Sequence, residues 1–217
     1  VFQPKVDING NLIGAEALAR WANKELGNVS PDEFIKCAEK SGSIGLLGTY
    51  MISLVCEQIN KWKKQAFTIP GRIAINVSPL QLADAKFVPE IVSLVKAFDV
   101  SPSQIEIELT ESGLLTDIDE SIDKLMQLKE AGFSIALDDF GTGYSSLSYL
   151  KDLPLDVLKV DRAFVNELEQ KNTAELARSI IAIGHHMSMC VVAEGVEQKQ
   201  QVETLHKMGC NIFQGYY

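Results

Sequence analysis

Eight polar residues lie at the ends of short apolar runs that are typical of buried strands. They are Glu16, Asn76, Glu108, Asp138, Asp139, Lys159, Glu194 and Gln214. Most of them follow Ile, Val, Leu and Ala, and surface polar residues would not recur so regularly. If the five carboxylates meet in one cleft, their charges repel and raise some of their pKa values unless cations separate them. The pattern therefore predicts a cation-binding cleft.

The residue types also indicate which cations the cleft would bind. Oxygen ligands in this number favour hard divalent ions such as Mg²⁺ or Mn²⁺ over zinc, which prefers His and Cys. Two such ions ~3.5–4 Å apart can activate a water and stabilise the attacking and leaving oxygens of a phosphoryl displacement. The adjacent carboxylates Asp138 and Asp139 are suited to bridging two ions, and Lys159 could orient the water or help to remove its proton. The predicted reaction is phosphodiester hydrolysis.

Strands and helices that alternate along the chain would bring these residues together. The predicted strands are 2–6, 12–18, 72–77, 105–109, 134–137, 157–159, 190–193 and 212–214. The predicted helices are 31–40, 45–64, 89–98, 119–131, 145–150, 173–185 and 198–208. Eight strands with intervening helices predict a TIM-type (β/α)8 barrel, in which active sites are built at the carboxyl ends of the strands.

The link between the first two strands predicts a departure from a regular barrel. It contains only residues 7–11, with Asn9-Gly10 as a tight hairpin signal. A parallel crossover does not fit into so short a link. We therefore expect a modified TIM-type barrel with the first strand antiparallel.

Composition and charge narrow the class of protein. The chain has 217 residues, of which 46% are hydrophobic and 23% charged, and no apolar run approaches the length of a membrane span. We expect one domain over residues 1–217, with no signal peptide and no membrane contact. The formal charge of −9 argues against binding of a nucleic-acid polymer. The four cysteines lack CxxC spacing and are expected to be reduced core residues.

Longer motifs follow one another through the chain. They are FQPKV from Phe2, GAEALARW from Gly14, INVSPLQL from Ile75, IELTES from Ile107, DDFGTGYSSLSYL from Asp138, LKVDRAFV from Leu158, VAEGVE from Val192 and GCNIFQGYY from Gly209. In these motifs the chain resembles, over essentially its whole length, the EAL-domain family of cyclic di-GMP-specific phosphodiesterases, which is named after a run like Glu16-Ala17-Leu18. The resemblance implies hydrolysis of this bacterial second messenger to linear pGpG with two Mg²⁺ or Mn²⁺ ions.

The resemblance also implies roles for single residues. The residues that match the metal ligands are Glu16, Asn76, Glu108, Asp138 and Glu194, with Asp139 at the second ion. Lys159 matches the lysine that contacts the catalytic water, and either Lys159 or Glu194 would act as general base. Glu16, Lys159 and Glu194 are therefore the expected catalytic residues. The residues that match dinucleotide-binding positions are Gln3, Leu18, Arg20, Glu197 and Gln214.

Residues 138–150 match a loop that links the metal site to a dimer interface in the family. Its coupling residues here are Phe140, Gly141, Thr142 and Gly143, and Glu111 is expected to steady it. The expected partners are cyclic di-GMP, a second copy of the chain bound through this loop after the fifth strand, and covalently linked sensory or regulatory domains of a larger signalling protein. The expected location is the cytoplasm, including the cytoplasmic portion of a membrane-bound sensor.

The residues themselves leave some alternatives open. Asn76 precedes Ser78-Pro79 and could belong to a turn or helix cap instead of a ligand set. Glu106 alternates with apolar residues as Glu108 does, and it lies either inside the barrel or exposed near its lower rim. The chain could also bind cyclic di-GMP without cutting it, or be a metal-dependent lyase or enolising enzyme that acts on small carboxylates.

Overall fold

Eight strands close into a barrel in the computed structural model, which describes residues 1–114, 118–141 and 150–217. The barrel strands are β1 (Phe2–Asp7), β2 (Leu12–Ala17), β5 (Ile73–Asn76), β6 (Ile105–Thr110), β7 (Ser134–Phe140), β8 (Val157–Val160), β9 (Cys190–Val196) and β10 (Ile212–Gly215). Their order around the barrel is β1-β10-β9-β8-β7-β6-β5-β2. The predicted eight-stranded barrel is confirmed.

Strand β1 runs antiparallel to both of its neighbours, as the short link predicts. Gln3 pairs with Glu16 of β2, and Lys5 pairs with Gln214 of β10, whereas β2 and β5 to β10 pair in parallel. Gly10 has φ +80° in the turn between β1 and β2, a conformation that favours glycine. Because of this reversal, β1 begins at the rim where the other strands end.

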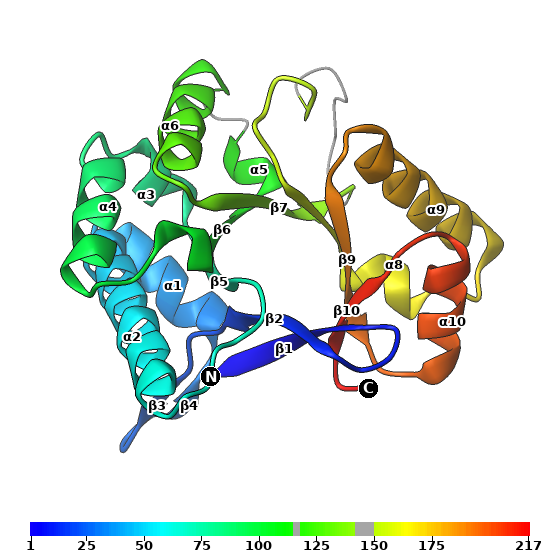
Figure 1. Ribbon diagram of the computed structural model, residues 1–217, viewed down its shortest axis with the longest axis horizontal. Helices are drawn as coiled ribbons and strands as arrows, with labels where there is room; N and C mark the ends of the chain where they lie inside the picture. Colours follow the sequence, from blue (N-terminus) through cyan, green and yellow to red (C-terminus); the bar gives the residue numbers. More distant parts are fainter. Residues whose placement is uncertain (115–117, 142–149) are drawn as a thin grey trace.

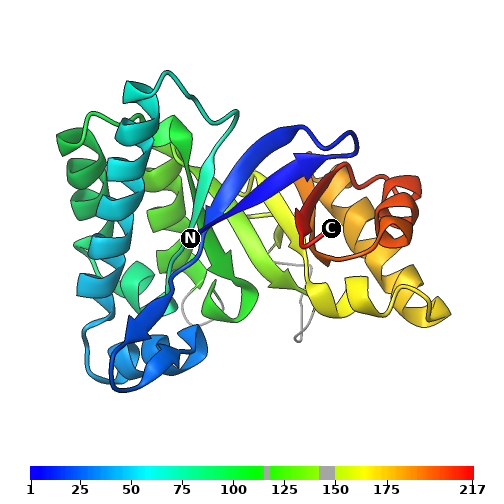
Figure 2. The same ribbon diagram turned by 90° about the horizontal axis from the view of Figure 1, so that it is seen from below.

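Helices surround the barrel on two sides. They are α1 (Pro31–Lys40), α2 (Ile44–Lys64), α3 (Pro79–Ala83), α4 (Phe87–Ala97), α5 (Glu111–Leu114), α6 (Ile118–Glu130), α8 (Arg162–Asn166), α9 (Lys171–His186) and α10 (Lys199–Lys207), with a 3-10 turn at Pro102–Gln104. Helices α2, α4 and α6 stand on one side and α9 and α10 on the other (Figure 1). In the view from below, β1 and β2 lie in front between the two groups (Figure 2).

The longer predicted helices are present with shifts of one or two residues at their ends. The hairpin of β3 (Trp21–Asn23) and β4 (Gly27–Val29) and the short helices α3, α5 and α8 were not predicted, since elements of three to five residues are too short to show a hydrophobic period. Apart from Leu150, the predicted helix 145–150 lies outside the described residues.

Alternation along the strands separates an apolar layer from a polar interior. The outward side chains of β6, Ile105, Ile107 and Leu109, are at most 2% exposed and belong to the main core between barrel and helices. A small separate cluster fills part of the barrel interior: Ala136, Val157, Val192 and Ile212. Each of these four lies two residues before a predicted site residue on the same strand, so the polar groups form the layer above them.

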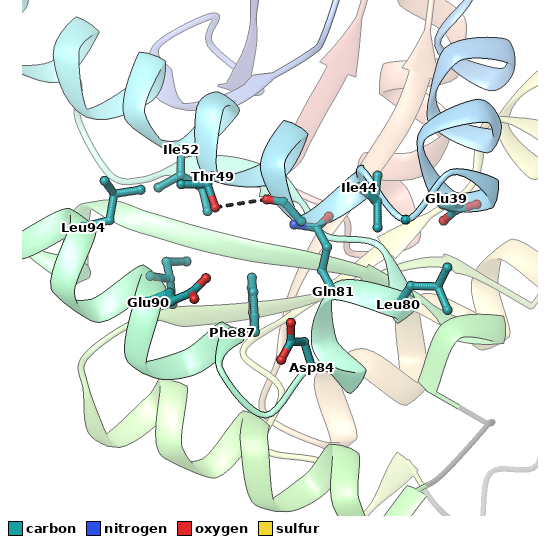
Figure 3. A pocket seen from close by; sticks show the side chains of 13 residues that line it. Glu39, Ile44, Thr49, Ile52, Leu80, Gln81, Asp84, Phe87, Glu90 and Leu94 are labelled. Atoms are coloured by element: carbon teal, nitrogen blue, oxygen red, sulfur yellow. Dashed lines mark hydrogen bonds between the residues drawn. The ribbon is translucent and has the colours of Figure 1, made fainter.

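The helices outside the barrel form a pocket, and their lengths and composition test the expectation of no membrane span. A cavity of about 230 Å³ lies among α1 to α4, lined by residues that include Glu39, Thr49 and Gln81, and none of the predicted site residues lines it (Figure 3). Within the described ranges, no helix is long and apolar enough to cross a bilayer.

The cysteines differ in exposure. Cys56 and Cys210 are buried, but Cys37 and Cys190 are exposed, so the prediction that the cysteines are core residues is wrong for Cys37 and Cys190. Cys37 lies on amphipathic α1 and Cys190 is the first residue of β9.

Candidate active site

The ammonium group of Lys159 lies at the centre of the polar layer. Its Nζ is 3.0 Å from Oε2 of Glu108, 3.2 Å from Oδ2 of Asp138 and 3.6 Å from Oε2 of Glu16, and it also forms an ion pair with Oε1 of Glu194. The lysine is completely buried. Parallel strands β2, β6, β7 and β9 thus direct four carboxylates to one point above β8, because their carboxyl ends meet at the same rim.

The charges in this layer do not balance. Burial lowers the pKa of Lys159, but the surrounding carboxylates outweigh it and hold the pKa well above its usual range, so this residue is a cation. Burial raises the pKa of Glu194 to about 8 against the pull of Lys159, and burial together with the charge of Glu108 raises the pKa of Glu16. One ammonium group therefore faces more negative charge than it neutralises.

Glu108 is held from both sides inside the barrel. It is completely buried, and its Oε1 accepts a hydrogen bond of 2.8 Å from Nζ of Lys5 on β1. Lys5 also donates to Oε1 of Glu106 at 2.7 Å, and Oε2 of Glu106 accepts from Oγ of Ser134 at 3.3 Å. Burial alone would raise the pKa of Glu108, but Lys159 and Lys5 together bring it below its usual value.

These contacts decide the open position of Glu106 and add a residue that the sequence analysis missed. Glu106 lies inside the barrel and is 6% exposed, because Lys5 compensates its charge. The available signal was the alternation of Gln3 and Lys5 in β1, which places both side chains on the interior face once β1 is a barrel strand.

Amide side chains orient Glu16. Nδ2 of Asn76 donates to Oε1 of Glu16 at 2.6 Å, and Nε2 of Gln214 donates to Oε2 at 2.5 Å and to Oε1 of Gln3 at 3.0 Å. Asn76 is the last residue of β5, whereas the N-cap of α3 is Ser78, whose Oγ accepts from the backbone N–H of Leu80. The capping role therefore belongs to Ser78, and Asn76 points to the carboxylates.

Asp138 and Asp139 are neighbours near the end of β7, and the backbone at Asp139 is in the left-handed region. Asp139 has φ +56°, and its backbone N–H donates to Oδ1 of Asp138 at 2.9 Å. Burial and the charges of Asp138 and Asp161 raise the pKa of Asp139 to about 6. The four carboxylates that contact Lys159, from Glu16, Glu108, Asp138 and Glu194, are here called the ring. The carboxylate of Asp139 lies beside this ring, where a further cation would relieve the repulsion.

The segment after Asp139 begins with an anchored backbone. Phe140 is 2% exposed and belongs to the hydrophobic core. Gly141 has φ +90°, and its N–H donates to Oε2 of Glu111 at 3.2 Å, so Glu111 holds the start of this segment. Thr142 and Gly143 lie outside the described residues.

Three of the predicted substrate-binding residues are not drawn into the ring. Arg20 is exposed, and its Nη1 donates to the carbonyl oxygen of Ala19 at 2.7 Å. Glu197 is exposed, and its backbone N–H donates to Oε1 of Gln201. Leu18 is partly buried. Its backbone N–H donates a hydrogen bond to the carbonyl oxygen of Val1, and its own carbonyl oxygen accepts one from the N-terminal ammonium of Val1. Their predicted contacts with a dinucleotide stay predictions.

The donor set is suited to hard divalent cations. Its oxygen donors are carboxylates and amides, and neither His nor Cys is among them. Within the part of the chain that the structure describes, no three His, Cys, Asp or Glu side chains are already arranged around a common metal position. Four of the carboxylates instead contact the ammonium group of Lys159. Within the same residues, Oε2 of Glu108 and Oε1 of Glu194 are buried and accept no regular hydrogen bond.

Known proteins are similar to this chain in sequence and fold. A family model described as the EAL domain matches residues 1–217. The chain is 41% identical over 217 residues to the Pseudomonas aeruginosa protein named bifunctional diguanylate cyclase/cyclic di-GMP phosphodiesterase MucR, covering 99% of this chain and 32% of that protein. It is 39% identical over 218 residues to cyclic di-GMP phosphodiesterase PA2567 of the same species, covering 100% of this chain and 37% of that protein.

The solved structures agree with the sequence matches. A structure described as PaMucR phosphodiesterase in complex with c-di-GMP has a TM-score of 0.94 and 41% identity, and the match covers 99% of this chain and 87% of that chain. The chain spans about a third of the length of the curated relatives named above. On the match across its whole length and on this barrel, the chain belongs to the EAL-domain family.

Proposed function

We propose that this chain hydrolyses one phosphodiester bond of cyclic di-GMP to give linear pGpG, with two divalent cations, Mg²⁺ or Mn²⁺. The observation that carries the proposal is the convergence of Glu16, Glu108, Asp138 and Glu194 on Lys159 at one rim of the barrel. Family membership and the names of the relatives MucR and PA2567 support the same substrate and reaction. The structure of PaMucR with c-di-GMP supports the ligand.

The proposed metal-holding residues are Glu16, Asn76, Glu108, Asp138, Asp139 and Glu194. When bound, divalent cations would lower the pKa of a coordinated water and offset charge on the phosphate oxygens. Gln214 and Asn76 would keep the carboxylate of Glu16 in place through their hydrogen bonds. The surplus negative charge of the ring provides the electrostatic attraction for these cations.

Lys159 and Glu194 divide the proton chemistry in the proposed mechanism. A charged ammonium donates hydrogen bonds but does not accept a proton, so Lys159 would orient the attacking water and contact the phosphate. Glu194 forms an ion pair with Lys159, and a carboxylate, unlike an ammonium, has lone pairs that can accept the proton of the water. The charges of this chain therefore favour Glu194 as the proton acceptor.

Substrate and partner contacts extend the proposal beyond the ring. Gln3, Leu18, Arg20, Glu197 and Gln214 would hold or frame the dinucleotide. The segment anchored by Glu111 and Gly141 would connect the site to a homodimer interface. Because the chain spans about a third of MucR and PA2567, we also propose that it is one domain, residues 1–217, of a larger cytoplasmic or membrane-linked signalling protein.

The proposal is tested by incubating the purified chain with cyclic di-GMP and Mg²⁺ and separating the products by chromatography. Linear pGpG is expected, and Glu16→Ala should lose activity by at least about 100-fold because an oriented metal-holding carboxylate is removed. Glu203→Ala, at an exposed position of α10, is the control and should retain activity. Tight binding without product would favour a receptor, and turnover of small carboxylates without pGpG would favour a lyase or enolising enzyme.

A further inference from the structure

A row of alternating charges runs through the barrel interior below the rim. Lys5 lies between Glu106 and Glu108, and Glu108 lies between Lys5 and Lys159. All four side chains are nearly or completely buried, with the side chain of Lys5 only 7% exposed. The ring around Lys159 is therefore connected to a second charged layer that comes from the antiparallel strand β1.

The reversal of β1 explains why a lysine lies at this depth. Strand β1 starts at the rim, so Gln3 pairs with Glu16 in the rim layer. Lys5, two residues later, faces the layer below. On β7 to β10 the same lower layer is filled by a small apolar cluster. A lone ammonium there would be costly, and Glu106 compensates it.

The two oxygens of Glu108 have separate partners. Oε1 accepts from Lys5 at 2.8 Å, and Oε2 lies 3.0 Å from Lys159 and faces the ring. Since Glu108 is completely buried, neither solvent nor a change of rotamer toward the surface competes with these contacts. A carboxylate with one oxygen fixed from below can present only the other oxygen upward.

We propose that Lys5 is a positioning residue for the metal site: it binds Oε1 of Glu108 and so leaves Oε2 as the one oxygen that Glu108 presents at the rim. Glu106 completes the arrangement, because it balances the charge of Lys5 and lets Glu108 keep a full negative charge toward the ring. The inference rests on the proposed metal-dependent function. It concerns Lys5 on β1 and Glu106 on β6, which are buried in the layer below the rim.

The test uses the double variant Lys5→Met/Glu106→Gln. Removing Lys5 alone leaves the buried Glu106 without its cation and Glu108 with Lys159 alone, and that variant is expected to unfold at lower temperature. The double variant keeps the lower layer neutral and similar in volume, so it should fold. Its affinity for Mg²⁺, measured by calorimetry without nucleotide, should fall by about 10–100-fold, as is usual when a partner of a metal ligand is lost.

Activity provides a second readout. The Mg²⁺ concentration for half-maximal rate should rise with the loss of affinity, while the KM for cyclic di-GMP at saturating Mg²⁺ stays as in the unchanged chain. A general loss of stability would lower the folded fraction but would not shift the Mg²⁺ requirement of the folded molecules.

The matched control is Lys129→Met/Asp156→Asn. This pair also joins a lysine to a carboxylate across the fold, but both side chains are about a third exposed and neither contacts the ring. The control should bind Mg²⁺ like the unchanged chain. If Lys5→Met/Glu106→Gln also binds Mg²⁺ normally, or if both double variants weaken binding equally, the positioning role is wrong. If the unchanged chain binds neither Mg²⁺ nor Mn²⁺, the proposed function itself fails.

Discussion

At the scale of single residues, the site is defined by excess negative charge in a buried place. Lys159 neutralises part of the charge of four carboxylates, and burial, together with the remaining negative charge, raises the pKa values of Glu16, Asp139 and Glu194. Each raised value means that the folded, metal-free chain holds a proton more tightly than the unfolded chain does. Proton binding and cation binding therefore compete for the same oxygens.

This competition predicts how stability depends on pH without metal. The pKa of Glu194 is about 8 in the folded chain, whereas an ordinary glutamate, as in the unfolded chain, has a pKa of 4.5. The folded state therefore binds more protons between these values. The contribution of this group to the free energy of unfolding should accordingly be fully present below pH 4.5 and be lost as the pH rises through 8. Thermal unfolding in EDTA from pH 5 to 9 measures this trend.

Glu194→Gln is the comparison for the pH series, because it keeps the side-chain shape and removes the titration. Its unfolding temperature should change less between pH 5 and 9 than that of the unchanged chain. A metal-free chain whose stability rises through this window would contradict the assignment. Added Mg²⁺ should stabilise the unchanged chain more at pH 8 than at pH 6, since fewer protons must be displaced.

At the scale of elements, the hairpin from β1 to β2 determines which residues share a layer. The link is short, Asp7 accepts from the backbone N–H groups of Asn9 and Asn11 at 2.8 Å, and Gly10 adopts φ +80°. The antiparallel course of β1 follows from this turn. It places Gln3 at the rim and Lys5 below it, which a parallel strand would reverse.

Substitution of Gly10 tests the turn. Space is open around the position, so the cost of a side chain comes from the left-handed backbone and not from a clash. Gly10→Val should lower the free energy of unfolding by about 1–2 kcal/mol. Gly10→Asn should lower it less, since Asn tolerates this conformation. Urea unfolding compares the two, and equal effects would show that the backbone conformation is not the cause.

At the scale of the whole molecule, the barrel joins residues that are far apart in the chain. Glu16 and Gln214 are separated by 198 positions but form a hydrogen bond, and Lys5 and Glu108 are separated by 103. The proposed ligands come from β2, β5, β6, β7 and β9. A cation bound by them would therefore contact the folded chain and not the unfolded one.

This predicts stabilisation of the whole domain by divalent cations. At 100 times its dissociation constant, Mg²⁺ should raise the free energy of unfolding by about 2.7 kcal/mol. Denaturant unfolding at pH 8 with MgCl₂, compared with NaCl at equal ionic strength, measures the effect. Glu16→Ala should lose most of the stabilisation. An equal response to both salts would indicate screening of surface charge instead of a specific site.

The sequence alone determined much of the fold and most members of the ring. Local patterns predicted the eight strands, the longer helices and the antiparallel β1, because alternation and Asn-Gly turns act over a few residues. Polar residues at strand ends pointed to Glu16, Glu108, Asp138 and Glu194, whose roles as ligands remain proposals. Short elements such as α3 and α5 carried no period long enough to detect.

Only the tertiary structure decided how the two charged layers meet. Nothing local to Lys5, Glu106 or Glu108 says that they contact one another, since barrel closure and the register of β1 bring them together. The exposed positions of Arg20 and Glu197 were equally invisible in the motifs. The physical reason is that burial and charge compensation depend on which strands become neighbours, whereas strand formation depends on residues close in sequence.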